Sequence, residues 1–381
     1  MIVVSAQAFP PKSGGIEALI SGMARHAFAS GHEVIVLADG GARTRRYDQS
    51  ATEPYHVERF GSWKPIRQRL KARRLSHIQK TRTIDAIYVD SWKSLEHANI
   101  RNGVPVVAWA HGNEFPENGV TKKTRISKAL SKASHLLINS QATASRAAPY
   151  LPSGLSTSVI NPPVEAPAVI KAEEAALVED LWQDAYPRLF SMCRLIELKG
   201  IDRAIEALPK ILTRFSKARY VIAGAGDDLS RLKRIADSLG INDRLSFIGW
   251  IDGGMKSALL SSATLFLQPG RAVDGKREGY GMAFVEAAAH GLPSIAGIAG
   301  GTSEAVIAER SGLLVDTTHS ETIADRILTL LEDEPGYQAL CRTSKIHGES
   351  CLWHNQIGRV LAAAGLSIRQ SPATPAASPM T

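Results

Sequence analysis

Hydrophobic runs alternate with amphipathic stretches from one end of the sequence to the other, and this alternation constrains the fold most. The runs are rich in Val and Ile and apolar on both faces, as buried parallel strands are. The stretches between them have helical periodicity, so the pattern predicts the α/β class, with parallel sheets wrapped by helices. We expect strands at residues 2–5, 33–38, 85–90, 104–110 and 135–139, and again at 188–193, 218–224, 244–249, 263–268, 293–297 and 312–316.

The chain is long enough for two such domains. Its 381 residues exceed what one hydrophobic core usually organises. The proline-rich stretch "NPPVEAP" at 161–167 is the best boundary. We therefore expect two Rossmann-like doubly wound domains facing each other across a cleft. The predicted parts are a first domain at 1–165, a second at 166–350, a C-terminal helix at 351–366 returning towards the first domain, and a disordered tail at 367–381.

Composition excludes several classes of protein. The three cysteines have no paired spacing and no histidine cluster suggests zinc, so the sequence predicts neither a disulfide framework nor a metal site. The N-terminal stretch lacks the pattern of a signal peptide, and no window reaches the ~18 apolar residues of a membrane span. We therefore expect a cytoplasmic protein that is not integral to a membrane.

Three loops after expected strands carry residues suited to an anionic ligand, because ligands of doubly wound sheets bind beyond the carboxyl ends of the strands. Gly14 and Gly15 open a helix, where backbone N–H groups and the helix dipole favour a phosphate. His111 follows a strand, and Arg194 and Lys199 form a cation pair suited to a diphosphate. Each has a structural alternative: a tight turn, a structural histidine, or cations that solvate a helix start.

Two glycine-rich loops in the second half differ in what they predict. In "GAGDD" at 224–228 the third glycine of a dinucleotide fingerprint is missing, because Leu229 stands in its place. No nicotinamide site is predicted there. Gly300 and Gly301, by contrast, precede two good N-cap residues, "TS", at the start of a helical stretch. They predict a second phosphate loop.

The stretch "REGYGMAFVEAAAHG" at 277–291 holds two glutamates eight positions apart. We expect Glu278 in a loop and Glu286 one turn inside a helix at 282–290. A fully helical run would separate the two by ~12 Å, whereas glycosidase carboxylate pairs lie ~5–10 Å apart. Two separate roles are therefore more natural than one shared bond. Glu286 would lean towards the helix N-terminus and could accept hydrogen bonds from a vicinal diol; a structural, paired glutamate is the alternative.

Together these pieces resemble the large retaining glycosyltransferases of the GT-B fold, the group numbered family four, which use nucleotide-sugar donors. The resemblance covers residues 1–365 and is most specific around the two glutamates. The matching motifs, in order, are "SGGIE", "HGNE", "RLIELKG", "FIGWI", "REGYGMAFVEAAAHGLPSIAG" and "GGTSEAV".

The resemblance implies a role for each matching residue. Glu286 would bind the ribose hydroxyls of the donor, and Glu278 the transferred sugar. Arg194 and Lys199 would neutralise the diphosphate leaving group, and His111 would lie near the reacting centre. The remaining donor contacts that it implies are Gly14, Gly15, Gly249, Trp250, Ile251, Gly281, Gly300 and Gly301. The sequence departs from the family at Cys193, where glycine is common, and this departure predicts a slightly narrower phosphate pocket.

The mechanism implied by the resemblance is departure of the nucleoside diphosphate with front-face attack by an acceptor hydroxyl. Configuration would be retained without a nucleophilic side chain, a metal or a cofactor, and the donor would carry a mannose- or glucose-type hexose. The implied acceptor is a hydroxyl of a glycan or a lipid-linked glycan in bacterial surface or exopolysaccharide synthesis. A nucleotide-sugar epimerase of the same fold and a non-catalytic nucleotide- or membrane-binding protein remain alternatives; a phosphorylase would need a longer chain and a cofactor lysine.

Positive charge is concentrated in the first half. Residues 1–165 hold 22 Lys and Arg against 12 Asp and Glu, within a net charge of +8 for the whole chain. Residues 59–84 hold nine basic side chains and no acid. This excess predicts an anionic partner, and we expect an anionic membrane surface rather than nucleic acid, because few aromatics are interleaved. A solvated helix face is the alternative. The expected membrane contacts are Arg67, Arg69, Lys71, Arg73 and Arg74.

Overall fold

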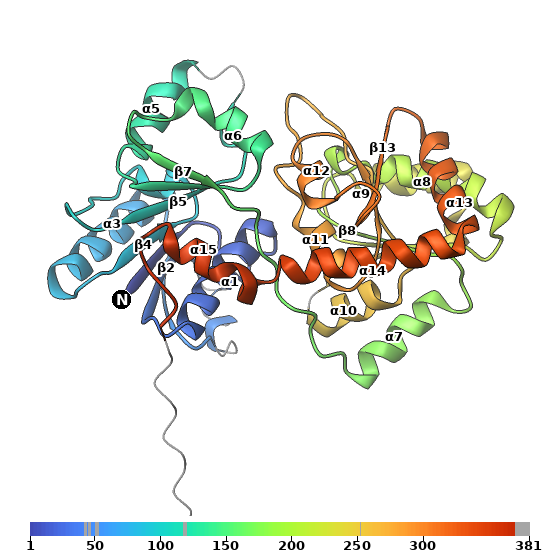
Figure 1. Cartoon of the computed structure of the whole chain (residues 1–381), viewed down its shortest axis with the longest axis horizontal. Helices are drawn as coiled ribbons and strands as arrows, with labels where there is room; N and C mark the ends of the chain where they lie inside the picture. The colour runs from blue at the N-terminus through green and yellow to red at the C-terminus, as the bar shows by residue number, and fades with distance from the viewer. Residues whose placement is uncertain (42–43, 45–46, 50–52, 117–119, 252, 370–381) are drawn as a thin grey trace, which may run out of the picture. The chain divides into compact units, whose positions relative to one another are not determined.

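The computed structural model describes residues 1–41, 44, 47–49, 53–116, 120–251 and 253–369 (Figure 1). The chain divides into two compact units, one made of residues 1–139, 144–160 and 353 onward, the other of residues 140–143 and 161–352. The division between them lies at Ile160, a few residues before the boundary expected at 165. The predicted tail beyond Arg369 lies outside the described residues.

The first unit is built on a seven-stranded parallel sheet with strand order β3-β2-β1-β4-β5-β6-β7. Its strands are β1 (Ile2–Ala6), β2 (Val34–Asp39), β3 (His56–Phe60), β4 (Ala86–Val89), β5 (Val106–Ala110), β6 (His135–Ile138) and β7 (Ser156–Val159). Its helices are α1 (Gly15–Ala29), α3 (Lys64–Thr81), α4 (Trp92–Leu95), α5 (Val120–Leu130), most of α6 (Gln141–Ala147), η1 (Ala148–Tyr150) and α15 (Trp353–Ala362).

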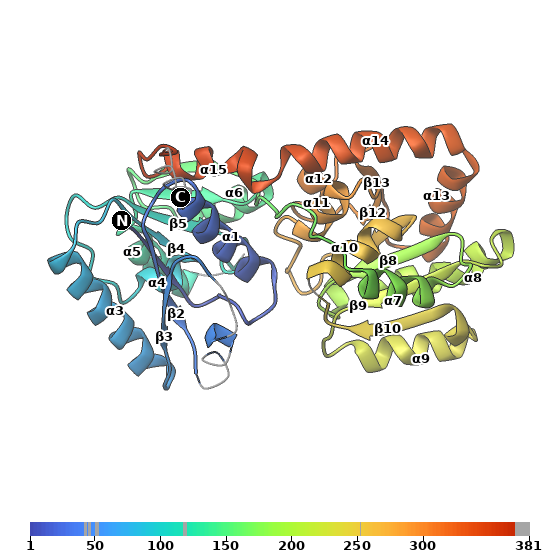
Figure 2. The same cartoon turned by 90° about the horizontal axis from the view of Figure 1, so that it is seen from below.

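Alternate strand residues face two helical layers in the first unit. Val3, Leu37 and Val89 belong to a core that also includes residues of α3, α4 and α5. Figure 2 shows α3 running beside β2 and β3. The other layer is formed by α1 and α15, which pack against each other.

The C-terminal helix α15 is fixed to the first unit by a close helix crossing. A Cβ atom on Gly22 of α1 would lie 2.2 Å from the indole nitrogen of Trp353, so only glycine admits this approach. The Trp353 ring stacks on His26 at a centroid distance of 5.5 Å, and the Tyr88 hydroxyl donates to the Val360 carbonyl at 2.9 Å. The segment 351–366, expected to return to the first domain, thus contains a helix of that unit.

The second unit has a six-stranded parallel sheet with strand order β10-β9-β8-β11-β12-β13. Its strands are β8 (Arg188–Met192), β9 (Arg219–Ala223), β10 (Leu245–Gly249), β11 (Leu265–Gln268), β12 (Ser294–Gly297) and β13 (Gly312–Val315). Its helices are α7 (Ala172–Trp182), η2 (Glu197–Lys199), α8 (Ile201–Arg214), α9 (Leu229–Leu239), η3 (Asn242–Arg244), α10 (Gly253–Ser262), α11 (Met282–Ala289), α12 (Thr302–Ala305), α13 (Ser320–Glu332) and α14 (Glu334–Ser350).

Alternation along β8, β9 and β11 again separates two cores. Leu189, Tyr220 and Leu267 pack with residues of α8, α9 and α13. Phe190 and Phe266 pack with residues of α7, α10 and α11. Both sheets are doubly wound, so the prediction of two Rossmann-like α/β units is confirmed.

The strand orders fix where a ligand can bind in each unit. In both sheets the chain runs outward from a first strand in one direction and then returns to its other side, so the order reverses between β1 and β4 and between β8 and β11. Ligands of open α/β sheets bind beyond the carboxyl ends of the strands at such a reversal. The loops after these four strands are therefore the first places to look for a site.

Candidate active site

Lys199 and Glu278 meet at the strand-order reversal of the second sheet. Lys199 lies in η2 after β8, and Glu278 lies in the loop after β11. The ammonium Nζ is 2.5 Å from Glu278 Oε2, and the two side chains are only 15% and 19% exposed. The amide of Gln268, the last residue of β11, also donates to Oε2 at 3.3 Å. No described residue bonds Oε1 of Glu278, so this oxygen is available to a ligand.

Gly200 allows Lys199 to approach Glu278. Gly200 follows Lys199 with φ at +70°, and a Cβ atom there would lie 1.8 Å from the Pro269 carbonyl oxygen. Both the positive φ and the contact require glycine. The loop after β8 therefore lies directly on the loop after β11, and this contact holds the Lys199 ammonium beside Glu278.

A buried ion cluster stabilises the same pair of loops. Arg271, in the loop after β11, donates to both carboxylate oxygens of Asp202 in α8, each at 2.8 Å. Burial alone would raise the pKa of Asp202, but the hydrogen bonds and charges of Arg271 and Arg231 outweigh it and lower that pKa. Asp202 stays ionised and ties the β11 loop to α8.

Arg194 lies in the same loop region but is not paired. It follows β8 directly and is exposed, and no hydrogen bond or ion pair within the described residues involves its guanidinium. The neighbouring Cys193 is fully buried in the core. Burial raises the pKa of the Cys193 thiol to about 12. Its side chain packs in the core of the second unit. The slightly narrower phosphate pocket that the resemblance implied stays a prediction.

Glu286 has its own cation. It lies in α11, 18% exposed, and accepts a hydrogen bond from Lys256 of α10 at 2.9 Å. His290 bonds the Glu286 carbonyl through Nδ1 at 2.8 Å and the Ser257 hydroxyl through Nε2 at 3.1 Å. Burial lowers the pKa of His290, which keeps the ring neutral and compatible with both bonds. The two glutamates are therefore held by separate partners from separate elements.

Gly300 and Gly301 support the Glu278 loop. The Gly301 N–H donates to the Glu278 carbonyl at 2.9 Å, and a Cβ atom on Gly300 would lie 2.2 Å from that carbonyl oxygen. The Gly301 N–H is thereby occupied. Gly301 is itself the N-cap of the short α12. The expectation that Thr302 or Ser303 caps this helix was wrong, because the helix already begins at Thr302.

The remaining predicted donor contacts surround these residues in the second unit. Gly281 is the N-cap of α11 with φ at +103°. At the end of β10, the Gly249 carbonyl accepts from the Gly224 N–H at 2.7 Å. Trp250 follows with 48% of its side chain exposed, and Ile251 packs against the core. The exposed indole at the carboxyl end of a strand offers an apolar surface for a planar base.

Gly224 and Gly226, which suggested an incomplete dinucleotide fingerprint, have a packing role. A Cβ atom on Gly224 would lie 1.8 Å from the Cys193 carbonyl oxygen, and one on Gly226 would lie 2.2 Å from that of Leu195. Both glycines let the loops after β8 and β9 touch.

In the first unit, His111 is oriented by Asp90. His111 follows β5, and its Nε2 lies 2.7 Å from the Asp90 carbonyl oxygen. Because a carbonyl only accepts, Nε2 carries the proton, and Nδ1 of the neutral ring is an acceptor. The Asp90 carboxylate accepts from the backbone N–H groups of Gln7 and Ala8 at 2.7 and 2.9 Å and from the Ser94 hydroxyl at 2.6 Å. One buried aspartate thus holds both the histidine and the loop after β1.

The loop held by Asp90 leads to Gly14 and Gly15. Gly14 is the N-cap of α1, and its φ of 165° is extended backbone that any residue adopts. A Cβ atom there would meet only the carboxylate of Glu17, at 2.5 Å. The first turn of α1 still presents the unbonded backbone N–H groups that every helix start has. Glycine here leaves them uncovered by a side chain.

Helix α3 does not present its basic residues as expected. Lys71 is 5% exposed and its ammonium bonds Asp39 and the Ala6 carbonyl, both at 2.7 Å. The prediction of a surface role for Lys71 was wrong, because its charge stabilises the end of the sheet. Arg67 pairs with Asp39 at 2.9 Å and Arg74 with Glu58 at 2.6 Å. Of the five expected contacts, Arg69 and Arg73 alone are exposed and unpaired within the described residues.

Gln268, Lys256 and Asp90 were not predicted from the sequence, although each bonds the side chain of a predicted site residue. The ion pair of Arg271 and Asp202 was not predicted either. Gln268 and Asp90 are polar residues at the end of a hydrophobic run, which is the signal that could have identified them. Lys256 has no such signal, since it lies within a helix. No group of three His, Cys, Asp or Glu in the described ranges could hold a metal ion, and no described helix has the length and apolar composition that crossing a bilayer requires.

Family models and relatives that match this chain are those of glycosyltransferases. Residues 13–166 match the family described as Glycosyltransferase Family 4, and residues 174–346 match Glycosyl transferases group 1. The GDP-mannose-dependent alpha-(1-6)-phosphatidylinositol monomannoside mannosyltransferase of Mycobacterium tuberculosis is 27% identical over 343 residues, which are 85% of this chain and 87% of that protein. A monoacylated-substrate counterpart from Corynebacterium glutamicum is 25% identical over 358 residues, 90% of this chain and 91% of that protein.

The fold is shared with solved structures. Anabaena Alr3699/HepE in complex with UDP aligns with a TM-score of 0.77 and 21% identity, over 95% of this chain and 98% of that one. Sucrose-phosphate synthase from Thermosynechococcus elongatus aligns with a TM-score of 0.72 and 16% identity, over 94% and 97%. Two doubly wound sheets, a site at the strand-order reversal of the second, and matches to both family halves lead to one conclusion: the chain belongs to the nucleotide-sugar glycosyltransferases of the GT-B type.

Proposed function

We propose that the protein transfers a hexose from a nucleoside-diphosphate sugar to a hydroxyl of a glycan or lipid-linked acceptor, with retention of configuration. The observation that carries this proposal is the grouping of Arg194, Lys199 and Glu278 around the strand-order reversal of the second sheet. An unpaired guanidinium and an ammonium in one loop suit a diphosphate. A carboxylate with one free oxygen suits the hydroxyls of a sugar.

The proposed roles follow from what each group can donate or accept. Arg194 and Lys199 stabilise the charge that builds on the departing diphosphate, which is the main catalytic contribution. Glu278 accepts from the transferred sugar and Glu286 from the ribose. His111 accepts, through Nδ1, a hydrogen bond from a hydroxyl near the reacting centre. In the second unit, the nucleobase lies against Gly249, Trp250 and Ile251, and the diphosphate is bordered by Gly281, Gly300 and Gly301. In the first unit, the helix start at Gly14 and Gly15 suits a phosphate by itself.

We further propose that no metal ion or cofactor is needed. Protein cations that already lie at the diphosphate position supply the positive charge that a metal would otherwise supply. The reaction forms a bond between the acceptor oxygen and the anomeric carbon on the face that the diphosphate leaves. The acceptor proton passes to the departing phosphate oxygen, so no side chain is consumed.

The donor is proposed to carry mannose or glucose. The mannosyltransferases from Mycobacterium tuberculosis and Corynebacterium glutamicum use GDP-mannose, and structures of the Anabaena protein contain UDP or UDP-glucose. GDP-mannose is the first donor to test because those relatives are 27% and 25% identical to this chain, against 21% for the Anabaena protein. A thermal-shift panel of GDP, UDP and ADP with their sugars identifies the base, since the cognate nucleotide should raise the melting temperature most.

Turnover tests the reaction itself. With the cognate donor, Glu286→Ala should abolish product formation, whereas Glu173→Ala, an exposed glutamate of α7, should leave it unchanged. Unchanged turnover in Glu286→Ala would refute its role. Interconversion of the donor sugar without transfer would instead identify an epimerase, and nucleotide binding without any conversion would identify a non-catalytic protein. Loss of turnover on adding EDTA would refute metal independence.

The acceptor is proposed to lie at an anionic membrane face. The named relatives act on phosphatidylinositol mannosides, and the excess positive charge is in the first half of the chain. The contacts proposed are Arg69 and Arg73, since the other three expected residues are engaged within the unit. Equal sedimentation with neutral and anionic vesicles at low salt would overturn the membrane proposal.

A further inference from the structure

A groove in the first unit separates α3 from the segment that follows α4. It has a volume of about 510 Å³. It is lined by Arg69, Ala72, Arg73, Ser76, His77, Lys80, His97 and Asn99. Four of these residues, spaced at 69, 73, 77 and 80, follow one face of α3. None of the residues that line the groove is an acid, so its charge is positive only.

The cations of the groove differ from the other cations of α3. Arg67, Lys71 and Arg74 are each paired with a carboxylate of β2 or β3. Arg69, Arg73 and Lys80 are exposed, and no described carboxylate pairs with them. The basic residues of α3 therefore form two sets. Those that face the sheet are paired with carboxylates, and those along the groove are not; this second set is the uncompensated set.

This uncompensated set destabilises the unoccupied protein. Arg69 and Arg73 are four positions apart on a helix, where like charges repel. Neither side chain gains a bond or burial in return. Such an arrangement is stabilised when an anion binds between the cations, because each then gains a charge-assisted hydrogen bond.

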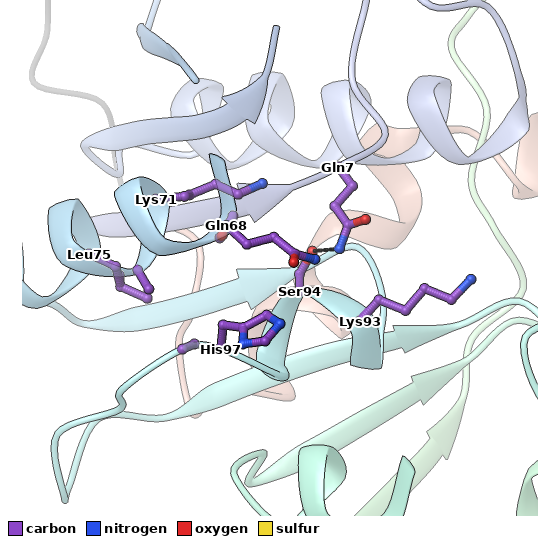
Figure 3. Close-up of a pocket in the computed structure, with 10 residues that line it drawn as sticks. Gln7, Gln68, Lys71, Leu75, Lys93, Ser94 and His97 are labelled. Carbon is purple, nitrogen blue, oxygen red and sulfur yellow. Dashed lines mark hydrogen bonds between the residues drawn. The ribbon is translucent and has the colours of Figure 1, made fainter. Parts of the chain in front are cut away.

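The groove leads into a second pocket that reaches the Asp90 cluster of the same unit. Ala72 and His97 also line a narrower pocket whose other walls include Gln7, Gln68 and Ser94. In Figure 3, Gln68 reaches from α3 towards Ser94, and His97 lies on the opposite wall. Ser94 bonds the Asp90 carboxylate at 2.6 Å. One end of the groove is therefore next to the residue that orients His111.

We propose that this groove binds a phosphate ester of the acceptor. Two guanidinium groups can each bind two phosphate oxygens, and Lys80 adds a point charge. His77, Ser76 and Asn99 add donors, and His97 adds a ring nitrogen that lies 3.9 Å from Glu96 Oε2. A membrane surface needs only exposed charge, whereas cations gathered along one open groove can bind an individual phosphate group. The assignment of the phosphate to the acceptor rests on the proposed function, but the binding itself does not.

Direct binding tests the proposal without any donor. The soluble probe is sn-glycerol 3-phosphate, with inorganic phosphate beside it, and the membrane probe is vesicles of phosphatidylcholine with or without phosphatidylglycerol. The test variant is Arg69→Ala/Arg73→Ala. The matched control is Lys233→Ala/Arg234→Ala on α9, which removes the same charge from exposed and unpaired positions of the second unit.

Wild type and the control should bind the phosphate ester equally, whereas the test variant should bind at least about tenfold more weakly. On anionic vesicles the loss should be roughly 30-fold, from ~1 kcal/mol per cation. If the soluble ester binds saturably, a phosphate group is sufficient for binding, whether it is free or part of a headgroup. If only anionic vesicles bind, and binding needs Arg69 and Arg73, the ligand is the lipid. Equal losses in both variants, or no saturable binding of either probe, would overturn the proposal.

The groove and the proposed transfer can fail separately. If Arg69→Ala/Arg73→Ala loses phosphate-ester binding while no donor is ever turned over, the groove stands and the proposed function falls. If donor turnover proceeds with the same acceptor KM in wild type and variant, the groove is refuted and the transfer stands. Thermal unfolding of the variant at or above the wild-type temperature confirms that its fold is intact.

Discussion

Replacing Asp90 with alanine should weaken both the stability and the activity of the protein. The substitution leaves the N–H groups of Gln7 and Ala8 without their acceptor, as well as the Ser94 hydroxyl. An unpaired buried donor costs about 1–3 kcal/mol. Water can reach these half-buried N–H groups, so the lower end applies to each, and we expect a loss of about 2–3 kcal/mol in the free energy of unfolding.

Two variants separate the charge from the hydrogen bonds. Asp90→Asn keeps an acceptor for the two N–H groups, and its amide can donate to the hydroxyl of Ser94, so only the charge assistance is lost, at about 1 kcal/mol. Ser94→Ala removes the third bond without touching the backbone donors and should cost at most about 1 kcal/mol. Urea unfolding of the full chain measures all three free energies.

The kinetic effect distinguishes positioning from simple stability. Asp90 holds the loop leading to α1 and, through its carbonyl, the ring of His111. Asp90→Ala should lower kcat and raise the donor KM at temperatures where the variant is fully folded, whereas Ser94→Ala should leave both near wild type. Wild-type unfolding and kinetics in Asp90→Ala would refute the reasoning from these contacts.

Three further perturbations concern the second unit. Gly200→Ala places a Cβ atom 1.8 Å from the Pro269 carbonyl oxygen at a positive φ. The variant should lose more than about 1 kcal/mol of unfolding free energy, measured in urea. It should also lower donor turnover, because the clash displaces Lys199. Lys199→Met leaves the mostly buried carboxylate of Glu278 unpaired, which should cost about 2 kcal/mol after allowance for its partial exposure and weaken nucleotide binding measured by calorimetry. Because burial lowers the pKa of His290 below the ordinary 6.5, the unfolded chain takes up the proton first as the pH falls. Stability should therefore decrease as the pH falls through 6.5 towards the folded pKa, and His290→Gln should flatten this dependence in urea titrations at a series of pH values.

Apart from the half-buried β10, the strands that the sequence predicted are mostly buried, and the two that it missed are edge strands. β3 ("HVERF") and β7 ("STSV") lie at opposite edges of the first sheet and are largely exposed or half-buried. A strand with one neighbour and little burial needs no hydrophobic run, so its sequence does not differ from that of a polar loop. A hydrophobic pattern predicts burial, so it predicts a strand only where that strand is buried.

The candidate residues were predictable in type but not in their partners. Residue types after strands indicated Lys199 and Glu278 at the second sheet and His111 at the first, because parallel strands bring their carboxyl ends to one edge of each sheet. Which cation meets which carboxylate depends on close backbone contacts such as that of Gly200 with Pro269. The burial of Lys71 also depends on partners that are distant in the sequence. A lysine in a basic, helical run was expected at the surface, but hydrogen bonds to the Asp39 carboxylate and to the Ala6 carbonyl at the end of β1 make a buried position favourable.

In each sheet, a carboxylate follows the strand that lies just past the strand-order reversal. The hydrogen-bond partners of each carboxylate determine what it can do. Asp90 follows β4 and accepts from two backbone N–H groups and a hydroxyl, none of which can leave without disrupting the loop. Glu278 follows β11 and is held by side chains, Lys199 and the amide of Gln268, which can reorient. A diphosphate that draws the Lys199 ammonium towards itself would free Glu278 for the hydroxyls of the sugar. Donor binding and sugar recognition would then be coupled through one ion pair. In Lys199→Met the carboxylate of Glu278 is free without a diphosphate, so the free sugar should bind more tightly than to wild type, whereas Arg194→Met should weaken the nucleoside diphosphate and leave the free sugar unchanged.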